Sequence, residues 1–460
     1  MKKRLFTIAI LTASVLSLNV SCSDDFVERE FNQSVQESPL TSLDEIQAFV
    51  RGAYASMRSS SYYGCDFLAY GEIRSDEMYS TKGSGYYTTI QDYSMLSTDG
   101  YASGTWNQIY TMIAKTNVAI NSDVASFKGT QNELRSAYFV QGQAYALRAL
   151  GFFDLLRLYG QKYTGAPDQL GVVLPTSYDP LAKMPRATIA ETEAQIEKDF
   201  AKAIELMTAN NAYSTVDGKT DISLTAVKAL MSRYYLAKGD YAKVRSLVGE
   251  IANSFNPVAS GLLAESFKFT MNGAAPNSIF ELAVGTNSSL STSSYRHKLH
   301  PNGYANLAVN PSVLSLYTAG DVRRALIQTV TSTGIHYITG KYTNTVGADN
   351  IKVVRIEEVL LNGVEAELNG GSPAKALEYY NKIVTNRGLT AATTVTMEML
   401  KRERTKELLG EGFRQWDLLR WGDTSYVPAG KNKNLLAFPI PRAEINIEGT
   451  LIKPNPGYEN

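Results

Sequence analysis

The stretch LTAVKALMSRYYLAKGDYAKVRSLVGEI, residues 224–251, decides the fold class. Apolar side chains recur at helical spacing on both sides of the dipeptide Gly239-Asp240. They are Ala226, Leu230, Tyr234, Tyr235 and Ala237 before the dipeptide, and Val244, Leu247, Val248 and Ile251 after it. The pattern predicts a hairpin of two helices joined by a short Gly-Asp turn.

A second hairpin is predicted at residues 356–383, with the turn Asn-Gly-Gly-Ser-Pro at 369–373. The spacing of both hairpins resembles a tetratricopeptide unit. Helical spacing also occurs in four earlier stretches, at residues 41–57, 106–118, 134–159 and 188–207. We interpret these stretches as degenerate pairs of the same kind, so the sequence predicts a mostly α-helical repeat stack.

The helix expected at residues 134–159 is apolar on most sides. Its small residues permit neighbouring helices to approach closely all round; they are Ala137, Gly142, Ala144, Ala149 and Gly151. We therefore expect this helix at the centre of the stack.

Two long segments interrupt the helical pattern. Residues 59–104 alternate glycines with many tyrosines, and a long loop of this kind inside a domain is more often functional than idle. Residues 259–351 are rich in Ser, Thr, Asn and Gly, with short apolar runs such as 279–284. We expect the two segments to form an irregular, loop-rich lobe with short strands.

The composition excludes several classes of protein. The chain has 460 residues, of which 44% are hydrophobic and 20% charged, as in folded globular proteins. Its 45 Lys and Arg balance 45 Asp and Glu, so no basic surface for nucleic acid is expected. Tyrosine supplies 28 aromatic rings, which suit contact surfaces as well as cores.

The N-terminus predicts export from the cytoplasm. Residues 1–21 have a basic start and an apolar stretch, as in a signal peptide, and Leu-Asn-Val-Ser-Cys at 18–22 resembles a bacterial lipoprotein cleavage box. Cys22 is then the lipidated residue; the alternative is an ordinary secretory signal with an incidental cysteine. Residues 22–38 are predicted to be a flexible acidic tether, whose Ser-Asp-Asp resembles a surface-export tag, and residues 39–460 a single domain.

Three stretches together resemble the SusD/RagB family of outer-membrane nutrient-binding lipoproteins. The first is the helix around Ala144–Gly160, with Leu147, Arg148, Phe152, Phe153, Asp154 and Arg157. The second is the charged stretch 403–422, with Glu403, Arg404, Glu407, Glu411, Gly412, Arg414, Trp416, Asp417, Arg420 and Trp421. The third is the tail, with Phe-Pro-Ile-Pro at 438–441 and Asn-Pro-Gly-Tyr at 455–458.

The resemblance implies four tetratricopeptide-like helix pairs that support the loop-rich lobe. It also implies a surface protein, lipid-anchored in the outer membrane, that captures oligo- or polysaccharide and acts as the lid of a SusC-like TonB-dependent transporter. Such proteins are not enzymes, and no cofactor is expected. Two alternatives stay open: a peptide-binding member of the same family, and a tetratricopeptide-type adaptor for protein partners.

Two groups of residues could suggest catalysis or metal binding. Glu403, Glu407 and Glu411 share one helix face and could flank a glycosidic bond, but interleaved arginines would keep them ionised. We predict a structural ion network instead, formed by Arg404, Glu407, Glu411, Arg414, Asp417 and Arg420. His297 and His300, one helical turn apart, are too few for a metal site, so no metal is expected.

The ligand site is predicted in residues 59–104 together with 284–310. A sugar offers apolar C–H faces ringed by hydroxyl groups, so flat aromatic rings stack on the faces while polar side chains bind the hydroxyls. We select Tyr86, Tyr87 and Tyr295 for stacking, and Asp76, Arg296 and Asn302 for the hydroxyl groups.

Overall fold

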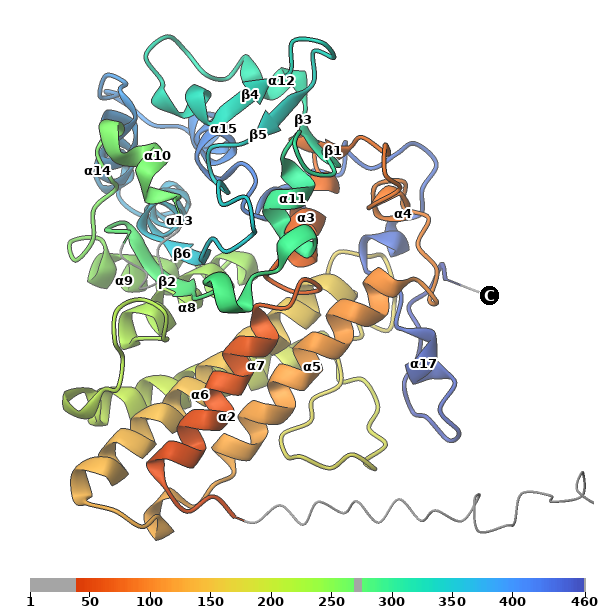
Figure 1. The fold of residues 1–460 in the computed structure, drawn as a ribbon, viewed down its shortest axis with the longest axis vertical. Coiled ribbons are helices and arrows are strands. Elements are labelled where there is room, and N and C mark those ends of the chain that lie inside the picture. Colours follow the sequence, from red (N-terminus) through yellow and green to blue (C-terminus); the bar gives the residue numbers. More distant parts are fainter. Residues whose placement is uncertain (1–38, 269–274, 459–460) are drawn as a thin grey trace, which may run out of the picture. The chain divides into compact units, whose positions relative to one another are not determined.

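The computed structural model describes residues 39–268 and 275–458 (Figure 1). The predicted signal peptide, the lipidation site Cys22 and the acidic tether lie outside the described residues. Within the described residues, no helix is both long and apolar enough to cross a membrane.

The first half of the fold consists of four long helices. They are α2 (Leu43–Met57), α5 (Gly100–Ile120), α6 (Gln131–Tyr159) and α7 (Ile189–Ala209). Helix α6 packs against the other three, and α2 also packs against α5 (Figure 1). Two of the helices begin in a capping box, in which Thr130 pairs with Glu133 and Thr188 with Glu191.

Helix α6 is the central helix, as predicted. Every residue from Ala146 to Gly160 is buried. At two glycines the neighbouring helix leaves no room for a side chain: a Cβ would lie 2.6 Å from Met207 Cγ of α7 at Gly142, and 2.6 Å from Met112 Cε of α5 at Gly151. The small residues therefore allow the close packing that their sequence pattern suggested.

The two hairpins form as predicted. They comprise α8 (Leu224–Lys238) with α9 (Tyr241–Ile251), and α13 (Ile356–Leu368) with α14 (Pro373–Val384). Gly239 ends α8 with a left-handed φ of 82°, and the Asp240 side chain caps α9. Helix α9 packs against α13, which joins the two hairpins. The mostly helical, tetratricopeptide-like fold is thus confirmed, with helix pairs α2–α5, α6–α7, α8–α9 and α13–α14.

The loop-rich lobe contains two small antiparallel sheets. One has the strand order β1-β3-β5-β4 and the other pairs β2 with β6. The strands are β1 (Met78–Ser80), β2 (Ser278–Leu282), β3 (Leu307–Val309), β4 (Ile327–Thr329), β5 (His336–Ile338) and β6 (Ile351–Arg355). The short strands expected between residues 259 and 351 are therefore present.

Residues 59–104 are less loop-like than predicted. They contain α3 (Asp66–Ile73), β1 and α4 (Thr88–Gln91), and α5 already begins at Gly100. Helix α3 escaped detection because every residue in it except Asp66 is buried, so it has no polar face and no helical periodicity.

The remaining helices are short, apart from one. They are α10 (Leu263–Ser266), α11 (Tyr295–Leu299), α12 (Pro311–Leu314), α15 (Met397–Leu408), α16 (Arg414–Arg420) and α17 (Arg442–Ile445). Helix α15 carries the charged face predicted from the sequence and packs against α13.

Candidate functional site

Strand pairing brings the two loop-rich segments together. β1 pairs with β3 in the register Met78 to Val309 and Ser80 to Leu307. Just beyond β1, the Thr81 hydroxyl donates to the Ala305 carbonyl at 2.8 Å, and the Thr81 N–H donates to the Asn306 carbonyl at 2.8 Å. The loop that follows β1 is therefore fastened to the segment that precedes β3.

These two segments hold three rings against one another, which we call the aromatic platform (Tyr86, Tyr304 and His297). The Tyr86 and Tyr304 ring centroids are 5.1 Å apart, and the His297 ring meets Tyr304 edge-on at 4.6 Å. Tyr304 is 37% exposed, while Tyr86 and His297 are half-buried. The platform thus presents aromatic surface to solvent.

A buried cation holds two of these rings in place. The Lys298 ammonium lies 3.3 Å from the Tyr86 centroid and 4.4 Å from the Tyr304 centroid. Burial lowers the pKa of Lys298, while Cys65 and Asp66 act in the opposite direction. Because a cation is attracted to the face of an aromatic ring, one charge orients both tyrosines.

The backbone around the platform is strained. Lys82, Tyr87 and Ala305 have φ values of 60°, 62° and 51°, in the left-handed region that residues with a Cβ seldom occupy. Such residues persist where the surrounding contacts over-determine them, and they cluster at functional sites. Here the Tyr87 N–H donates to the Tyr101 hydroxyl at 3.1 Å, which helps to hold the turn.

Two of the three tyrosines selected for stacking are in the core, so their selection was wrong. Tyr87 is 0% exposed, stacks on Tyr101 and donates its O–H to Asp66 at 2.8 Å. Burial raises the pKa of Asp66 to about 6. Tyr295 is 3% exposed and packs edge-on against Tyr342. Neither ring has a free face for a ligand.

The three polar selections lie apart from one another. Asn302 is exposed in the turn that leads to Tyr304. The Asp76 carboxylate is engaged by the Arg414 guanidinium at 2.6 and 2.8 Å. Arg296 is buried and lines a small cavity of about 20 Å³ together with Tyr63, Tyr295 and Asp349. Of the six selections, only Tyr86 and Asn302 therefore lie in the two platform segments without being buried or held in an ion pair.

Sequence reasoning missed Tyr304 and Lys298, and it misjudged the geometry of the histidines. α11 ends at Leu299, so His300 has extended backbone and is not one helical turn from His297. The His300 Nδ1 accepts from the Asn302 N–H at 3.2 Å. Within residues 39–268 and 275–458, no group of three or more His, Cys, Asp or Glu side chains is placed to hold a metal.

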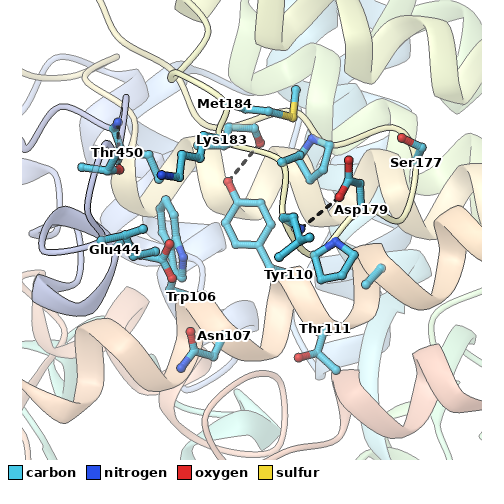
Figure 2. A pocket seen from close by; sticks show the side chains of 18 residues that line it. Trp106, Asn107, Tyr110, Thr111, Ser177, Asp179, Lys183, Met184, Glu444 and Thr450 are labelled. Carbon is cyan, nitrogen blue, oxygen red and sulfur yellow. Dashed lines mark hydrogen bonds between the residues drawn. The ribbon is translucent and has the colours of Figure 1, made fainter. Parts of the chain in front are cut away.

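A pocket of about 650 Å³ lies apart from the platform, against helix α5 (Figure 2). One wall is a face of α5 that includes Trp106, Tyr110 and Ala114; the other walls come from the loop 173–184 and the C-terminal segment 444–452. The Tyr110 hydroxyl donates to the Val173 carbonyl at 2.9 Å, and Asn117 donates to the Pro175 carbonyl at 2.9 Å. These bonds fasten the loop to α5, so the pocket is preformed.

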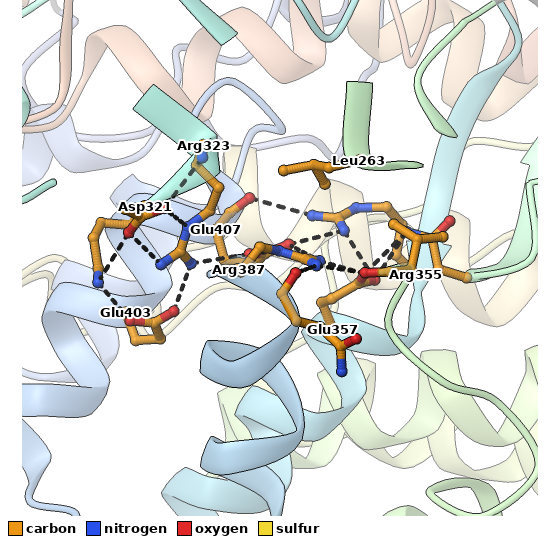
Figure 3. A network of polar contacts seen from close by, with 12 residues as sticks. Leu263, Asp321, Arg323, Arg355, Glu357, Arg387, Glu403 and Glu407 are labelled. Atoms are coloured by element: carbon orange, nitrogen blue, oxygen red, sulfur yellow. Dashed lines mark hydrogen bonds and ion pairs between the residues drawn. The ribbon is translucent and has the colours of Figure 1, made fainter. Parts of the chain in front are cut away.

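The predicted charged residues are all in ion pairs. Arg404 and Arg420 pair with Asp417 inside the predicted set, whereas Glu407, Glu411 and Arg414 pair with residues from elsewhere in the chain. Figure 3 shows the network around Glu407. Glu407 receives three buried arginines from outside its own helix, Arg323 at 3.0 Å, Arg355 at 3.2 Å and Arg387 at 2.9 Å. They hold the pKa of Glu407 well below its ordinary value, against the effect of burial. Glu411 pairs with Arg355 and Lys341.

The other members form two separate groups. Asp417 joins Arg404 and Arg420, at 2.6 and 2.8 Å, and Arg414 pairs with Asp76 and Glu77. Arg402, which the sequence interleaves with the glutamates, is exposed and pairs with Glu398. None of the arginines of the charged stretch therefore pairs with Glu407. Glu407 faces the core, where it meets Arg355 of β6 and Arg387, which follows α14.

Comparison with known proteins agrees with this architecture. One family model, described as starch-binding and associating with the outer membrane, matches residues 25–236. The model of the SusD family matches residues 326–436. The chain belongs to the SusD/RagB family. A SusD-like protein P2 from Formosa agariphila is 24% identical and aligns over 100% of both chains.

Solved SusD-like structures share the fold over most of this chain. A putative sugar-binding protein from Bacteroides vulgatus is 25% identical, with a TM-score of 0.82 over 92% of this SusD-like chain and 100% of its own. A SusD-superfamily protein from Bacteroides thetaiotaomicron gives 25% identity and a TM-score of 0.80, over 91% and 100%. A laminarin-binding SusD-like protein shares the fold, with a TM-score of 0.73 and 21% identity, over 91% and 100%.

Proposed function

We propose that this SusD-like protein captures an oligo- or polysaccharide at the cell surface and delivers it to a SusC-like TonB-dependent transporter in the outer membrane. In this proposal Cys22 carries the lipid anchor, and residues 39–460 act as one binding domain. The protein binds its ligand reversibly and leaves it chemically unchanged.

The aromatic platform is the observation that carries this proposal. Tyr304 and Tyr86 lie side by side on strained, firmly fastened loops, with Tyr304 open to solvent. Two exposed polar side chains lie on the same segments: the Ser84 hydroxyl donates to the Tyr304 carbonyl at 3.5 Å, and Asn302 stands in the turn that leads to Tyr304. A sugar ring needs this combination, since its C–H face stacks on an aromatic surface while its hydroxyls seek polar partners.

The carboxylates of the charged stretch 403–422 are evidence for a binding protein rather than a glycosidase. A glycosidase needs one carboxyl group that can donate a proton near neutral pH. Glu407 is ionised and buried among three arginines, and Glu411 is likewise held by Arg355 and Lys341. These side chains stabilise the fold and have no access to a substrate.

The test is a glycan array probed with the full-length protein, with a peptide pool as the second arm. We then expect Tyr304→Ala and Tyr86→Ala to weaken binding of the best glycan several-fold to about tenfold, since stacking is worth about 0.5–1.5 kcal/mol beyond area burial. Calorimetry measures the affinity, and the melting temperature should stay unchanged.

Tyr213→Ala is the matched control, because Tyr213 is also 37% exposed but lies outside both platform segments. It should leave the affinity unaltered. A Tyr86→Ala, Tyr304→Ala double variant that binds like the wild type would place the site elsewhere. Binding to the peptide pool alone would replace the glycan by a peptide ligand.

A further inference from the structure

The preformed pocket beside α5 has features that the glycan proposal does not use. Its floor is the α5 face with Asn107, Tyr110, Thr111 and Ala114, and aliphatic groups from both flanking segments complete the walls (Figure 2). A volume of about 650 Å³ lies within the range of true ligand pockets. The question is which chemistry fits it.

The aromatic rings of the pocket are poorly placed to stack on a sugar. Trp106 is 3% exposed, because it packs against Tyr110 at 4.7 Å and edge-on against Tyr159 at 5.0 Å. The Tyr110 hydroxyl is already bound to the Val173 carbonyl. Trp106 therefore leaves little ring face open, and the aliphatic groups of the lining suit an aliphatic side chain better than a pyranose face.

The rim of the pocket is unusually apolar. Nine large apolar or aromatic side chains are exposed in the described part of the chain, and four of them lie on the two flanking segments. Leu181 (87%) and Ile447 (49%) line the pocket itself, and Tyr178 (51%) and Leu451 (52%) are neighbours in the chain of lining residues. Clustered exposed apolar groups around a cavity mark a surface for a protein partner.

The charged side chains that line the pocket favour a positively charged ligand group. Asp179 and Glu444 line it; the Asp179 carboxylate accepts from the Leu181 N–H at 2.9 Å and Glu444 from Trp106, and neither is in an ion pair with another described residue. The single lysine of the lining, Lys183, donates to the Glu448 carbonyl. Burial raises the pKa of Glu444, as expected for a carboxylate that lacks a cationic neighbour. A positively charged group would complement both acids.

We propose that this pocket docks an extended peptide segment of a partner protein, with a bulky aliphatic side chain in the cavity and an adjacent lysine or arginine facing Asp179 and Glu444. The aliphatic side chain anchors the segment against α5, and the rim residues cover the peptide on either side. The basic residue makes the site selective for basic over acidic peptides, since the two carboxylates gain a cationic partner on binding. This docking is independent of the glycan platform.

Three fluorescein-labelled hexapeptides test the proposal by fluorescence anisotropy on the full-length protein in lipid nanodiscs. Their central pairs are leucine–lysine, leucine–glutamate and serine–serine, in otherwise identical glycine–serine sequences. We expect the leucine–lysine peptide to bind at least tenfold more tightly than the other two. Glu444→Gln should reduce its advantage over the leucine–glutamate peptide several-fold.

Two variants block the pocket in different ways. Ala114→Trp fills the cavity, and Leu181→Ser removes an apolar rim group that is too exposed to affect folding. Both variants should lower the affinity for the leucine–lysine peptide at least fivefold. Gln108→Trp is the matched control on α5, because Gln108 does not line the pocket. It should leave peptide binding unchanged.

Equal binding of all three peptides, or no binding by any, would overturn the proposal. Peptide binding that survives both Ala114→Trp and Leu181→Ser would do the same. The last experiment uses a neutral hexasaccharide, maltohexaose. If Ala114→Trp abolishes maltohexaose binding and the peptides do not compete with maltohexaose, the pocket is a sugar site instead. Variants of the aromatic platform should leave peptide binding intact, which separates this proposal from the glycan proposal.

Discussion

At the scale of single residues, Glu407 carries the largest concentration of buried charge that we describe. Its carboxylate accepts from Arg323, Arg355 and Arg387, which are 2%, 1% and 0% exposed at the side chain. Removing the carboxylate would leave three guanidinium groups without their shared acceptor. We expect Glu407→Ala to lower the free energy of unfolding by roughly 3–5 kcal/mol, as for other broken buried ion pairs.

Chemical denaturation measures this effect, and Glu398→Ala is the control on the same helix. Glu398 pairs with Arg402, but both side chains are more than 60% exposed. Such a pair contributes less than about 1 kcal/mol, so the control should unfold almost like the wild type. Equal effects of the two substitutions would refute the buried-network interpretation.

The same carboxylate sets an acid limit on stability. The pKa of Glu407 is lower in the folded protein than in the unfolded chain, so the unfolded chain binds the proton first as the pH falls. Its stabilising contribution is complete above a pH of about 4.3 and is lost progressively below it. The wild type should therefore lose stability more steeply below pH 4 than Glu407→Gln.

At the scale of elements, helix α3 packs against the turn between α15 and α16 and binds its backbone. The Glu72 carboxylate accepts from the backbone N–H groups of Gly410 and Gly412, at 3.1 and 2.6 Å. Burial raises the pKa of Glu72 to about 7, although these bonds act against the rise. A Cβ at Gly71 would lie only 2.2 Å from the Gly412 carbonyl oxygen. The helix and the turn are thus in direct backbone contact.

Gly71→Ala should therefore destabilise the protein by roughly 1–3 kcal/mol, the usual cost of overpacking. Gly52→Ala on α2 is the matched substitution, because a Cβ there would meet only the flexible Lys115 side chain, at 3.4 Å. Since alanine favours a helix by about 1 kcal/mol over glycine, this control should raise the denaturation midpoint. A neutral Gly71→Ala variant would mean that α3 and the turn can separate at little cost.

At the scale of the whole molecule, membrane attachment is predicted to depend on Cys22 alone. Stable anchoring requires more than one acyl chain, so a triacylated Cys22 would hold the protein at the membrane. Cys22→Ala should move the protein into the soluble fraction in cells that lack the transporter. Cys65→Ala is the control, because Cys65 is buried and should not affect fractionation. A Cys22→Ala variant that remains with the membranes would place the anchor elsewhere.

The sequence by itself determined the helices, the two hairpins and the central place of α6. Those features follow from apolar spacing within a few turns of chain and from small residues on one helix, which are local properties. It also singled out residues 59–104 and 284–310 as candidate ligand segments, because glycine and tyrosine enrichment is visible without a structure, and that assignment stays a prediction. It failed on α3, since a helix buried all round has no periodicity to detect.

Only the tertiary structure decided which side chain does what within those regions. Tyr87 and Tyr304 are chemically identical, but one lies under Tyr101 in the core and the other is open to solvent. The choice depends on contacts such as that of Thr81 with Ala305, 224 positions apart. The partners of Glu407 were likewise hidden, because Arg323 and Arg355 lie 84 and 52 positions away. Burial and ion pairing are set by such long-range contacts, and no local pattern records them.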